Sequence, residues 1–230
     1  MTDIQTPPGL PLPDSTPDGR ARAIAMQAAS QAQCEPTGIV AYQSAGNLLV
    51  VGSDEGIDNA RESLAGYDGL SVTGLVRNAG DPAPLLSGWL GHFELQKSGN
   101  EPQVYDLVLD LATPPLLDLE LPPPGYFAPG EDSAALQGAV AELAGLTGEF
   151  EKPQYYHYDA AICAHGRSGM TACTRCLDTC PTGAISSLGD TIEVNANLCQ
   201  GAGSCATACP TGAIGYSYPR LSDTLHRLRL

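Results

Sequence analysis

The sequence predicts an α+β protein, in which an α/β sheet domain at residues 20–150 precedes a cysteine-rich module at residues 151–220. Two observations support this prediction. Apolar, β-branched runs alternate with helix-forming segments over the first part, which is typical of a sheet covered by helices. Seven of the eight cysteines lie in the second part, where the hexapeptide Cys-Pro-Thr-Gly-Ala-Ile occurs at 180–185 and again at 209–214.

The net charge of −15 is carried by the first 150 residues, because acids and bases are balanced from Glu151 onward. An acidic surface of this kind repels phosphate backbones and attracts basic partners. The composition therefore argues against a nucleic acid partner. It leaves open whether the acids only keep the domain soluble or also dock a protein.

No targeting or membrane segment stands out in the sequence. There is no apolar run near the roughly 20 residues that a membrane-spanning helix needs, and the N-terminus has no basic segment followed by an apolar one. We therefore expect no membrane span and a cytoplasmic location. In that reducing compartment, clustered cysteines bind metal more often than they form disulfides.

The N-terminal third predicts a tail followed by alternating helices and strands. Residues 1–19 contain five prolines and almost no large apolar side chains, which predicts a disordered tail. Cys34 follows a predicted helix at 20–33 and is expected to be an ordinary core or surface thiol. The next predicted elements are strands at 38–42 and 47–52 around a Ser-Ala-Gly turn, a helix from Asp54 to about Ala65, and a strand at 70–76.

The middle of the chain predicts more sheet and one further helix. Alternation of valine and aspartate from Val104 to Asp110 predicts a sheet with one wet face. A proline-rich passage at 114–130 is expected to be irregular. The other predicted elements are strands at 88–96 and 103–112, a helix at 133–146 entered at Asp132 or Ser133, a domain boundary near 147–152, and a last helix at 221–230.

The cysteines repeat with a fixed spacing. Superposing the second hexapeptide on the first places Cys205 on Cys176 and Cys209 on Cys180, so the unit Cys-x3-Cys-Pro occurs twice. Bacterial iron–sulfur modules space their ligands as C-x2-C-x2-C-x3-C-P, and the last cysteine binds the other of two clusters. Short loops wrap backbone N–H groups around a cluster, and the proline ends the local helix. The repeat therefore predicts a module with two iron–sulfur clusters.

Roughly residues 156–218, about a quarter of the chain, resemble the dicluster bacterial-type ferredoxins, including the seven-iron type that pairs [3Fe–4S] with [4Fe–4S]. The resemblance implies a pseudo-twofold βαβ–βαβ ferredoxin fold and one-electron transfer. The whole sequence is also similar to the N-terminal part of larger ferredoxin-domain proteins from bacterial redox gene clusters, and the helical pattern at 221–230 has no stop signal. We therefore expect a redox protein partner, or further domains of a longer chain.

Each copy of the repeat departs from the ferredoxin pattern at one position. Met170 stands where the first copy should have a cysteine, and Ala202 stands there in the second. Cys163 lies upstream of Met170, and the glycine-containing insertion between them can loop back to supply the missing thiolate. Nothing comparable lies near Ala202, so the two halves are predicted to be unequal.

The crossover of the resembled family implies two ligand sets. The first cluster, which we expect to be [4Fe–4S], would be bound by Cys163, Cys173, Cys176 and Cys209. The second would be bound by Cys180, Cys199 and Cys205. Three thiolates suit a [3Fe–4S] cluster, which lacks the iron that has no ligand. The alternative is a second [4Fe–4S] cluster with an outside ligand.

Other residues of the module are predicted to support the clusters. His165 is an alternative iron ligand, since imidazole binds iron, although the cysteines already complete the first set. Gly201 and Gly203 are expected to let the backbone close around the second cluster. Ile185 and Ile214, at matching positions of the repeat, are expected to form an apolar shell that excludes water.

The rest of the sequence shows no Ser/His/Asp set, nucleotide-binding loop or histidine-rich metal motif. We therefore expect an electron carrier, or an electron-transfer domain of an oxidoreductase, without substrate chemistry of its own. A second hypothesis is an iron–sulfur sensor, whose labile three-cysteine cluster switches partner binding. A third is a structural zinc module with four-cysteine sites, which the three-cysteine set and the two Cys-Pro pairs disfavour.

Overall fold

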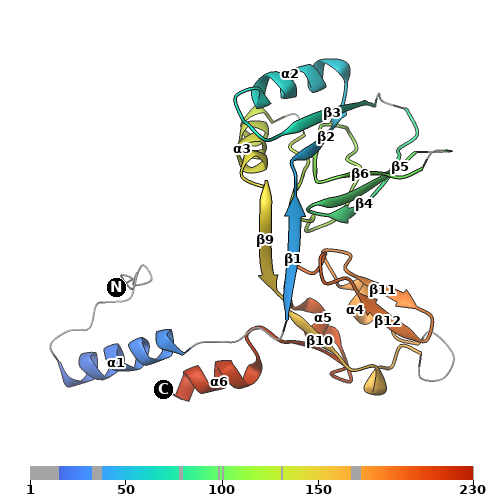
Figure 1. Cartoon of the computed structure of the whole chain (residues 1–230). Coiled ribbons are helices and arrows are strands. Elements are labelled where there is room, and N and C mark those ends of the chain that lie inside the picture. Colours follow the sequence, from blue (N-terminus) through green and yellow to red (C-terminus); the bar gives the residue numbers. More distant parts are fainter. Residues whose placement is uncertain are drawn as a thin grey trace.

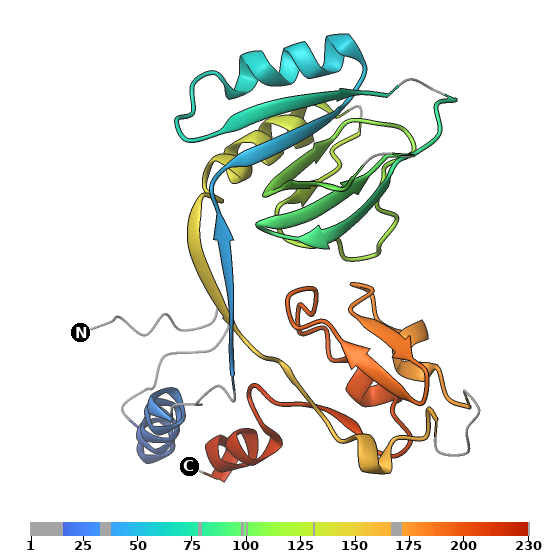
Figure 2. The ribbon, with the colours of Figure 1, turned by 45° about the vertical axis from the view of Figure 1, so that its right-hand side comes forward.

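A computed structural model of the chain describes residues 16–32, 38–77, 80–97, 99, 101–130, 132–166 and 172–229. A ribbon formed by β1 (Ile39–Ser44) and β9 (Gly148–Pro153) joins an upper sheet domain to a lower cysteine-rich module (Figure 1). Helices α1 (Pro17–Gln31) and α6 (Leu221–Arg229) lie side by side beside the module (Figure 2). Among the helices of the described ranges, none combines the length and apolar character needed to cross a bilayer.

A parallel sheet forms the middle layer of the N-terminal domain. Its strand order is β3-β2-β7-β8, and β2 pairs in parallel with both β3 and β7. Helix α2 forms the connection between β2 and β3. The bounds of these elements are Asn47–Gly52 for β2, Asp54–Leu64 for α2, Ser71–Val76 for β3, Leu107–Asp110 for β7 and Tyr126–Phe127 for β8.

Each face of the parallel sheet packs against a different layer. Leu48 and Val50 belong to a core shared with α2 and with α3 (Ser133–Ala144). Leu49 and Val51 point the other way, and pack with Phe93 of an antiparallel sheet. That sheet has the order β4-β5-β6, with bounds Leu85–Trp89, His92–Gln96 and Gln103–Tyr105. The central strand is therefore buried on both faces, as in other covered parallel sheets.

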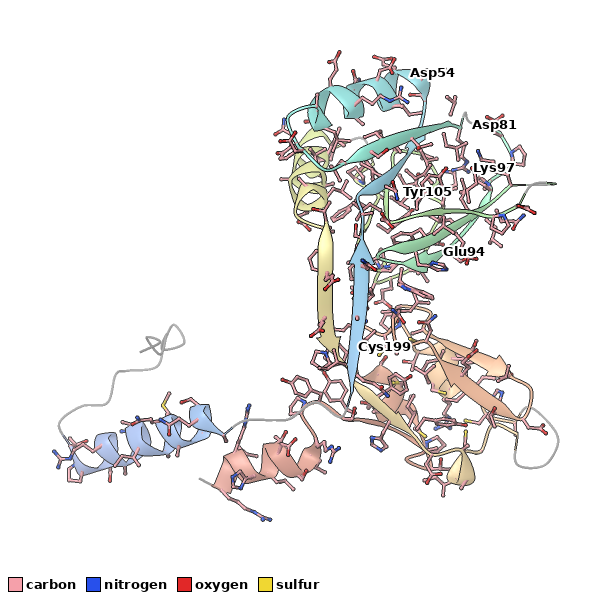
Figure 3. All side chains as sticks on the ribbon, viewed as in Figure 1. Asp54, Asp81, Glu94, Lys97, Tyr105 and Cys199 are labelled. Carbon is pink, nitrogen blue, oxygen red and sulfur yellow. The ribbon has the colours of Figure 1, made fainter. Side chains whose placement is uncertain are left out.

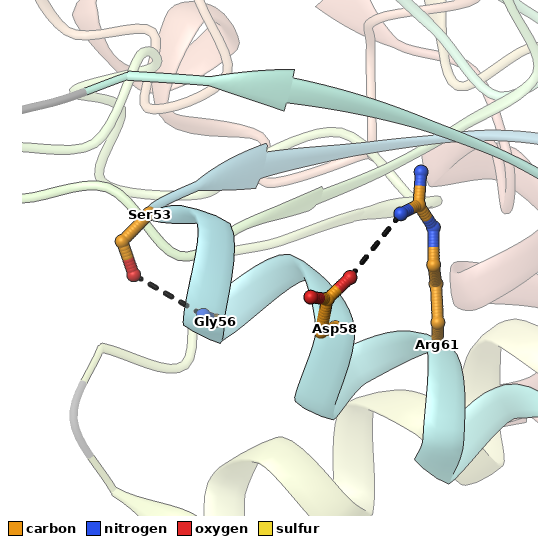
Figure 4. Close-up of polar contacts among 4 residues, drawn as sticks. All are labelled: Ser53, Gly56, Asp58 and Arg61. Carbon is orange, nitrogen blue, oxygen red and sulfur yellow. Dashed lines mark hydrogen bonds and ion pairs between the residues drawn. The ribbon is translucent and has the colours of Figure 1, made fainter.

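The helices predicted between residues 20 and 146 are present, although α1 lies beside the cysteine-rich module and not against the sheet. Helix α1 begins at Pro17, three residues before the predicted start, and α3 begins at Ser133 as predicted, after the capping residue Asp132. At the start of α2, the N–H of Gly56 donates to Oγ of Ser53 at 3.1 Å, which satisfies a group that the helix leaves free (Figure 4). One turn on, Asp58 and Arg61 form an exposed ion pair at 3.3 Å.

The prediction of a single strand over 88–96 is wrong, because the chain reverses between β4 and β5. The register pairs Trp89 with His92, so the turn lies at Leu90 and Gly91. Gly91 has a φ of 82°, and a Cβ atom there would collide with the carbonyl oxygen of Gln43. Only glycine fits this turn without strain.

The strand predicted over 103–112 is divided at Asp106, and its two parts belong to different sheets. The prediction of one wet face is also wrong, because all four residues of β7 are buried. Asp106 is buried as well, and its carboxylate accepts hydrogen bonds from the N–H groups of Ala45 at 2.9 Å and Asn47 at 3.0 Å. Asp106 is therefore a buried, hydrogen-bonded residue and not part of a wet face.

The connecting ribbon brings together two segments that are far apart in the sequence. Strand β1 does not pair with β2 across the Ser-Ala-Gly turn; it pairs in antiparallel fashion with β9, from Ile39 opposite Pro153 to Ser44 opposite Gly148. The boundary that the sequence suggests near 147–152 thus falls on a strand. The ribbon leads directly from the upper domain into the cysteine-rich module.

The cysteine-rich module contains the order strand, short helix, strand twice. The first unit is β10 (Tyr156–Tyr158), α4 (Arg175–Asp178) and β11 (Ile185–Leu188), with the short helix η1 (Ala160–Ile162) before α4. The second is β12 (Thr191–Val194), α5 (Ser204–Ala208) and β13 (Ile214–Tyr216). Strand β10 pairs with β13 and β11 with β12, both antiparallel. Ile185, Ile192 and Ile214 are buried together between the units.

The proline-rich passage at 114–130 has only the short strand β8, and a buried carboxylate holds it in place. Asp110 is 1% exposed. It accepts hydrogen bonds from the N–H of Ala112 at 3.0 Å, from the N–H of Leu116 at 2.6 Å and from the hydroxyl of Tyr126 at 2.6 Å. Burial, reinforced by the hydrogen bond to Asp110, raises the pKa of Tyr126, so its hydroxyl stays a donor.

We expect Asp110→Ala to lower the free energy of unfolding of the sheet domain by about 3 kcal/mol, because three donors lose their acceptor inside the protein. Urea denaturation followed by the fluorescence of Trp89, the single tryptophan, measures the change. Asp118→Ala, an exposed position of the same passage, is the control and should stay within about 0.5 kcal/mol of wild type. Equal effects of the two substitutions would contradict the anchoring role of Asp110.

Candidate functional site

The seven cysteines of the module lie around the two short helices, and none is in a disulfide. Cys34 and Met170 lie outside the described residues. The positions are Cys163 after η1, Cys173 before α4, Cys176 in α4, Cys180 after α4, Cys199 before α5, Cys205 in α5 and Cys209 after α5.

Four cysteines line one cavity, which we call the first cavity. They are Cys163, Cys173, Cys176 and Cys209. Tyr158, Ile192 and Ile214 contribute apolar surface to the same cavity. These cysteines are the four that the sequence predicts for the first cluster, including Cys163 from outside the regular spacing.

The other three cysteines line a second cavity. They are Cys180, Cys199 and Cys205. Ile185, Val194 and Ile214 supply apolar surface, so Ile214 borders both cavities. Ala202, at the position where the ferredoxin pattern has a cysteine, also lines the second cavity and is exposed to solvent. The three thiols are therefore those predicted for the second cluster, and the position that lacks a thiol is exposed.

The loop around Ala202 depends on two glycines. Gly201 and Gly203 both have a φ of 76°, a conformation that other residues rarely adopt. A Cβ atom on Gly201 would lie 2.8 Å from the ring of Tyr155, which itself stacks with Tyr216. Gly203 lies immediately before α5. Glycine is thus required here by backbone conformation at both positions and by the neighbouring aromatic ring at the first.

The sulfur of the last cysteine in each copy lies near the hydroxyl of a threonine two residues later. The hydroxyl of Thr182 lies 3.3 Å from Sγ of Cys180, and that of Thr211 lies 3.6 Å from Sγ of Cys209. Burial alone would raise the pKa of Cys209, but hydrogen bonds from the backbone N–H groups of Ile214, Thr211 and Ala213 and from the Thr211 hydroxyl lower it to about 7. These donors favour a thiolate, which is the form that binds metal.

Burial opposes ionisation of other cysteines in the two cavities. It raises the pKa of Cys176 to about 11 and also raises that of Cys205. Burial likewise raises the pKa of Cys199, while a hydrogen bond from the backbone of Gly201 and the charge of Lys152 act in the opposite direction. Thiols in such positions ionise when a bound metal supplies positive charge.

His165 has no nitrogen free for iron. The residue is 1% exposed. Its Nδ1 donates to the carbonyl oxygen of Cys173 at 2.7 Å, and its Nε2 lies 2.8 Å from Oγ of Ser187. An iron–imidazole bond would have to replace one of these contacts, so the structure favours Cys163 as the ligand. The histidine instead joins the segment before α4 to β11.

The donor set fits iron–sulfur clusters. Thiols, backbone N–H groups and apolar side chains line both cavities, as cluster binding requires. Across the described ranges, no group of three or more His, Cys, Asp or Glu side chains lies close enough together to bind a single metal ion. The cysteines are therefore spaced around cavities and do not converge on one point.

Comparison with known proteins identifies the same segment. Residues 171–213 match the family described as 4Fe-4S dicluster domain. Over 45 residues the chain is 49% identical to hydrogenase-4 component A of Escherichia coli (strain K12), covering 20% of this chain and 22% of that protein. Over 67 residues it is 39% identical to the putative oxidoreductase AegA of the same organism, covering 26% of this chain and 10% of that protein.

These similarities confirm the coarser part of the sequence prediction. The segment at 171–213 is a ferredoxin-like iron–sulfur domain, and its relatives are associated with oxidoreductases. The similarity spans less than a quarter of the length of either relative. The segment that matches the family lies outside the acidic sheet domain.

Several residues that border the site carried no assignment from sequence. Thr182 and Thr211 could have been found, because they occupy the same position in the duplicated hexapeptide. Lys152 and Tyr42 had no such signal. Their side chains reach the loop before Cys199 only because β1 pairs with β9.

We expect Thr182→Val to lower the reduction potential of the cluster bound through Cys180, and Thr211→Val to lower that of the cluster bound through Cys209. Loss of a hydrogen bond to the ligand sulfur disfavours the more negative, reduced state. A neutral hydrogen bond of about 1 kcal/mol corresponds to about a fivefold change in the equilibrium constant for reduction.

A redox titration followed by EPR measures both clusters in one sample, and each variant is the control for the other. The two substitutions should therefore move different clusters. If both variants shift the same cluster, the assignment of Cys180 and Cys209 to different cavities is wrong.

Proposed function

We propose that residues 151–220 transfer single electrons through two iron–sulfur clusters and serve a larger redox system. In this proposal the first cavity holds [4Fe–4S] and the second holds [3Fe–4S]. The observation that carries the proposal is the division of the seven cysteines into a cavity with four and a cavity with three. This division coincides with the two ligand sets implied by the ferredoxin pattern.

The groups of the chain hold the sites and adjust their charge. Four and three thiolates would ligate iron, which would supply one-electron oxidation and reduction when bound. Backbone N–H groups of Thr211, Ala213 and Ile214 offset negative charge at the sulfur of Cys209. Ile214 is common to both cavities and keeps water from the space between them. The two sites are therefore neighbours, as electron transfer between them requires.

The electron partner in this proposal is a redox protein or a further domain of a longer chain, in the cytoplasm. The named relatives include a hydrogenase component and a putative oxidoreductase, and the shared segment is a small part of each. The acidic sheet domain carries the negative charge of the chain and offers a surface for a basic partner.

A sensor function is a second proposal, and the exposure of Ala202 favours it. The exposed position of Ala202 would give an outside ligand or oxidant access to the corner that lacks a thiolate. A [4Fe–4S] cluster with an outside ligand would occupy the same site. Reversible conversion between the two cluster types, accompanied by a change in partner affinity, would distinguish a sensor from an electron carrier.

Protein prepared without oxygen should contain about seven iron and about eight sulfide atoms per chain and should show visible cluster absorbance. The EPR spectrum of the oxidised protein should contain the signal of [3Fe–4S], and that of the reduced protein the signal of [4Fe–4S]. Stoichiometric zinc without a chromophore would overturn the proposal. An iron content sufficient for two complete [4Fe–4S] clusters would instead support the alternative, in which the second site holds [4Fe–4S].

We expect Ala202→Cys to convert the second cluster to [4Fe–4S], because the new thiol would complete the ferredoxin spacing beside Cys199 and Cys205. The oxidised [3Fe–4S] signal should be lost, and iron should rise by about one atom per chain. Ala202→Ser, which adds a hydroxyl in place of a thiol, is the matched control and should retain the signal. An unchanged spectrum in the cysteine variant would show that position 202 does not face the open corner.

A further inference from the structure

Polar contacts tie the sheet domain and the ribbon to the loops that border the second cavity. The hydroxyl of Tyr42 in β1 donates to the carbonyl oxygen of Asn197 at 2.6 Å. On the other side, Nε2 of Gln200 donates to the carbonyl oxygen of Pro122 at 2.7 Å. The N–H of Leu121 donates to the carbonyl oxygen of Pro181 at 3.0 Å. Both sides of the ligand loop around Cys199 are therefore held from outside the cysteine-rich module.

Lys152 also contacts a predicted ligand residue directly, because it donates a hydrogen bond to the backbone of Cys199. It lies in β9 opposite Val40, so it shares a face of the ribbon with Tyr42. Its Nζ donates to the carbonyl oxygens of Asn197 at 2.8 Å and Cys199 at 2.7 Å. The ammonium also lies 5.0 Å from the centre of the Tyr42 ring, which favours a cation.

The charge of Lys152 is not paired with a carboxylate. Within the described part of the chain, no Asp or Glu oxygen lies within ion-pair distance of its Nζ, although the protein has 26 acids and only 11 lysines and arginines. The side chain is half-buried, and this burial lowers the pKa of its ammonium to about 8, so the amino group is still mostly protonated at pH 7. Solvent screens its charge less than that of a surface lysine. Its field therefore acts on the second cavity, and on Cys199 in particular.

We propose that Lys152 is a positioning residue for the second cluster, which it affects in two ways. Its hydrogen bonds hold the loop of Cys199 closed, and its positive charge raises the reduction potential of the cluster bound by Cys180, Cys199 and Cys205. Adding one electron makes a cluster more negative, and a fixed positive charge nearby stabilises that state. This inference rests on the proposed electron transfer, and it gives the ribbon the role of adjusting one of two clusters.

The test compares Lys152→Met with Lys97→Met in the full chain. Both substitutions remove one positive charge and keep an apolar stem, but Lys97 lies in the sheet domain far from Cys199 (Figure 3). EPR redox titration reads the two clusters separately in each protein. We expect K152M to make reduction of the second cluster about tenfold less favourable, which is about 59 mV for one electron. The first cluster should move much less, and K97M should leave both potentials unchanged.

Further variants separate charge from structure. Lys152→Arg keeps the charge and should retain the potential of the second cluster, while Lys152→Gln keeps hydrogen-bond donors without charge and should lower it. If K152M does not assemble the second cluster, K152Q takes its place in the comparison. An unchanged second-cluster potential in the uncharged variant, or an equal shift of both clusters, overturns the proposal. Failure of the proposed function itself would appear earlier, as a wild-type protein without two cluster signals.

Discussion

Each short helix of the cysteine-rich module must serve two cavities at once. Cys176 in α4 borders the first cavity, and Cys180 after α4 borders the second. Around α5 the order is reversed, because Cys205 borders the second cavity and Cys209 the first. Four residues are about one helical turn, so the two cysteines of a pair lie on the same side of the helix, although their thiols border different cavities. Neither cavity can be completed by its own half of the repeat. The pairing of β10 with β13 and the packing of Ile214 between the halves follow from this requirement.

The duplicated halves are unequal in their surroundings as well as in their ligands. The first cavity obtains its fourth thiol from Cys163, in a segment that His165 fastens to β11 through Ser187. The second has three thiols, an exposed Ala202, and a loop held by residues of the sheet domain and the ribbon. Among the described residues, the first site is thus built within the module, whereas the second also draws support from the rest of the chain. This difference gives the acidic domain a structural connection to the redox module.

The grouping of the seven cysteines could be predicted from the sequence more completely than the fold, because thiol spacing is local and chemically specific; their role as cluster ligands stays a prediction. Even the irregular Cys163 was predicted, and it lines the expected cavity. The sheet was harder to predict. Asp106 and Asp110 resembled a wet face but are buried, since hydrogen bonds compensate their charge. The pairing of β1 with β9 joins segments about a hundred residues apart, and no local pattern encodes it. The contacts of Lys152 depend on that pairing.

The hydrogen bonds from the ribbon to Asn197 also imply thermodynamic linkage. If the second site binds a cluster, as proposed, a loop that Tyr42 and Lys152 already hold in place loses less conformational entropy on binding than a free loop. Linkage is reciprocal, so loading the second site must stabilise the ribbon by the same free energy. A protein that bound the sheet domain and strained the ribbon would therefore weaken metal retention at the second site first. The first site, which lacks this connection in the described residues, would be affected less.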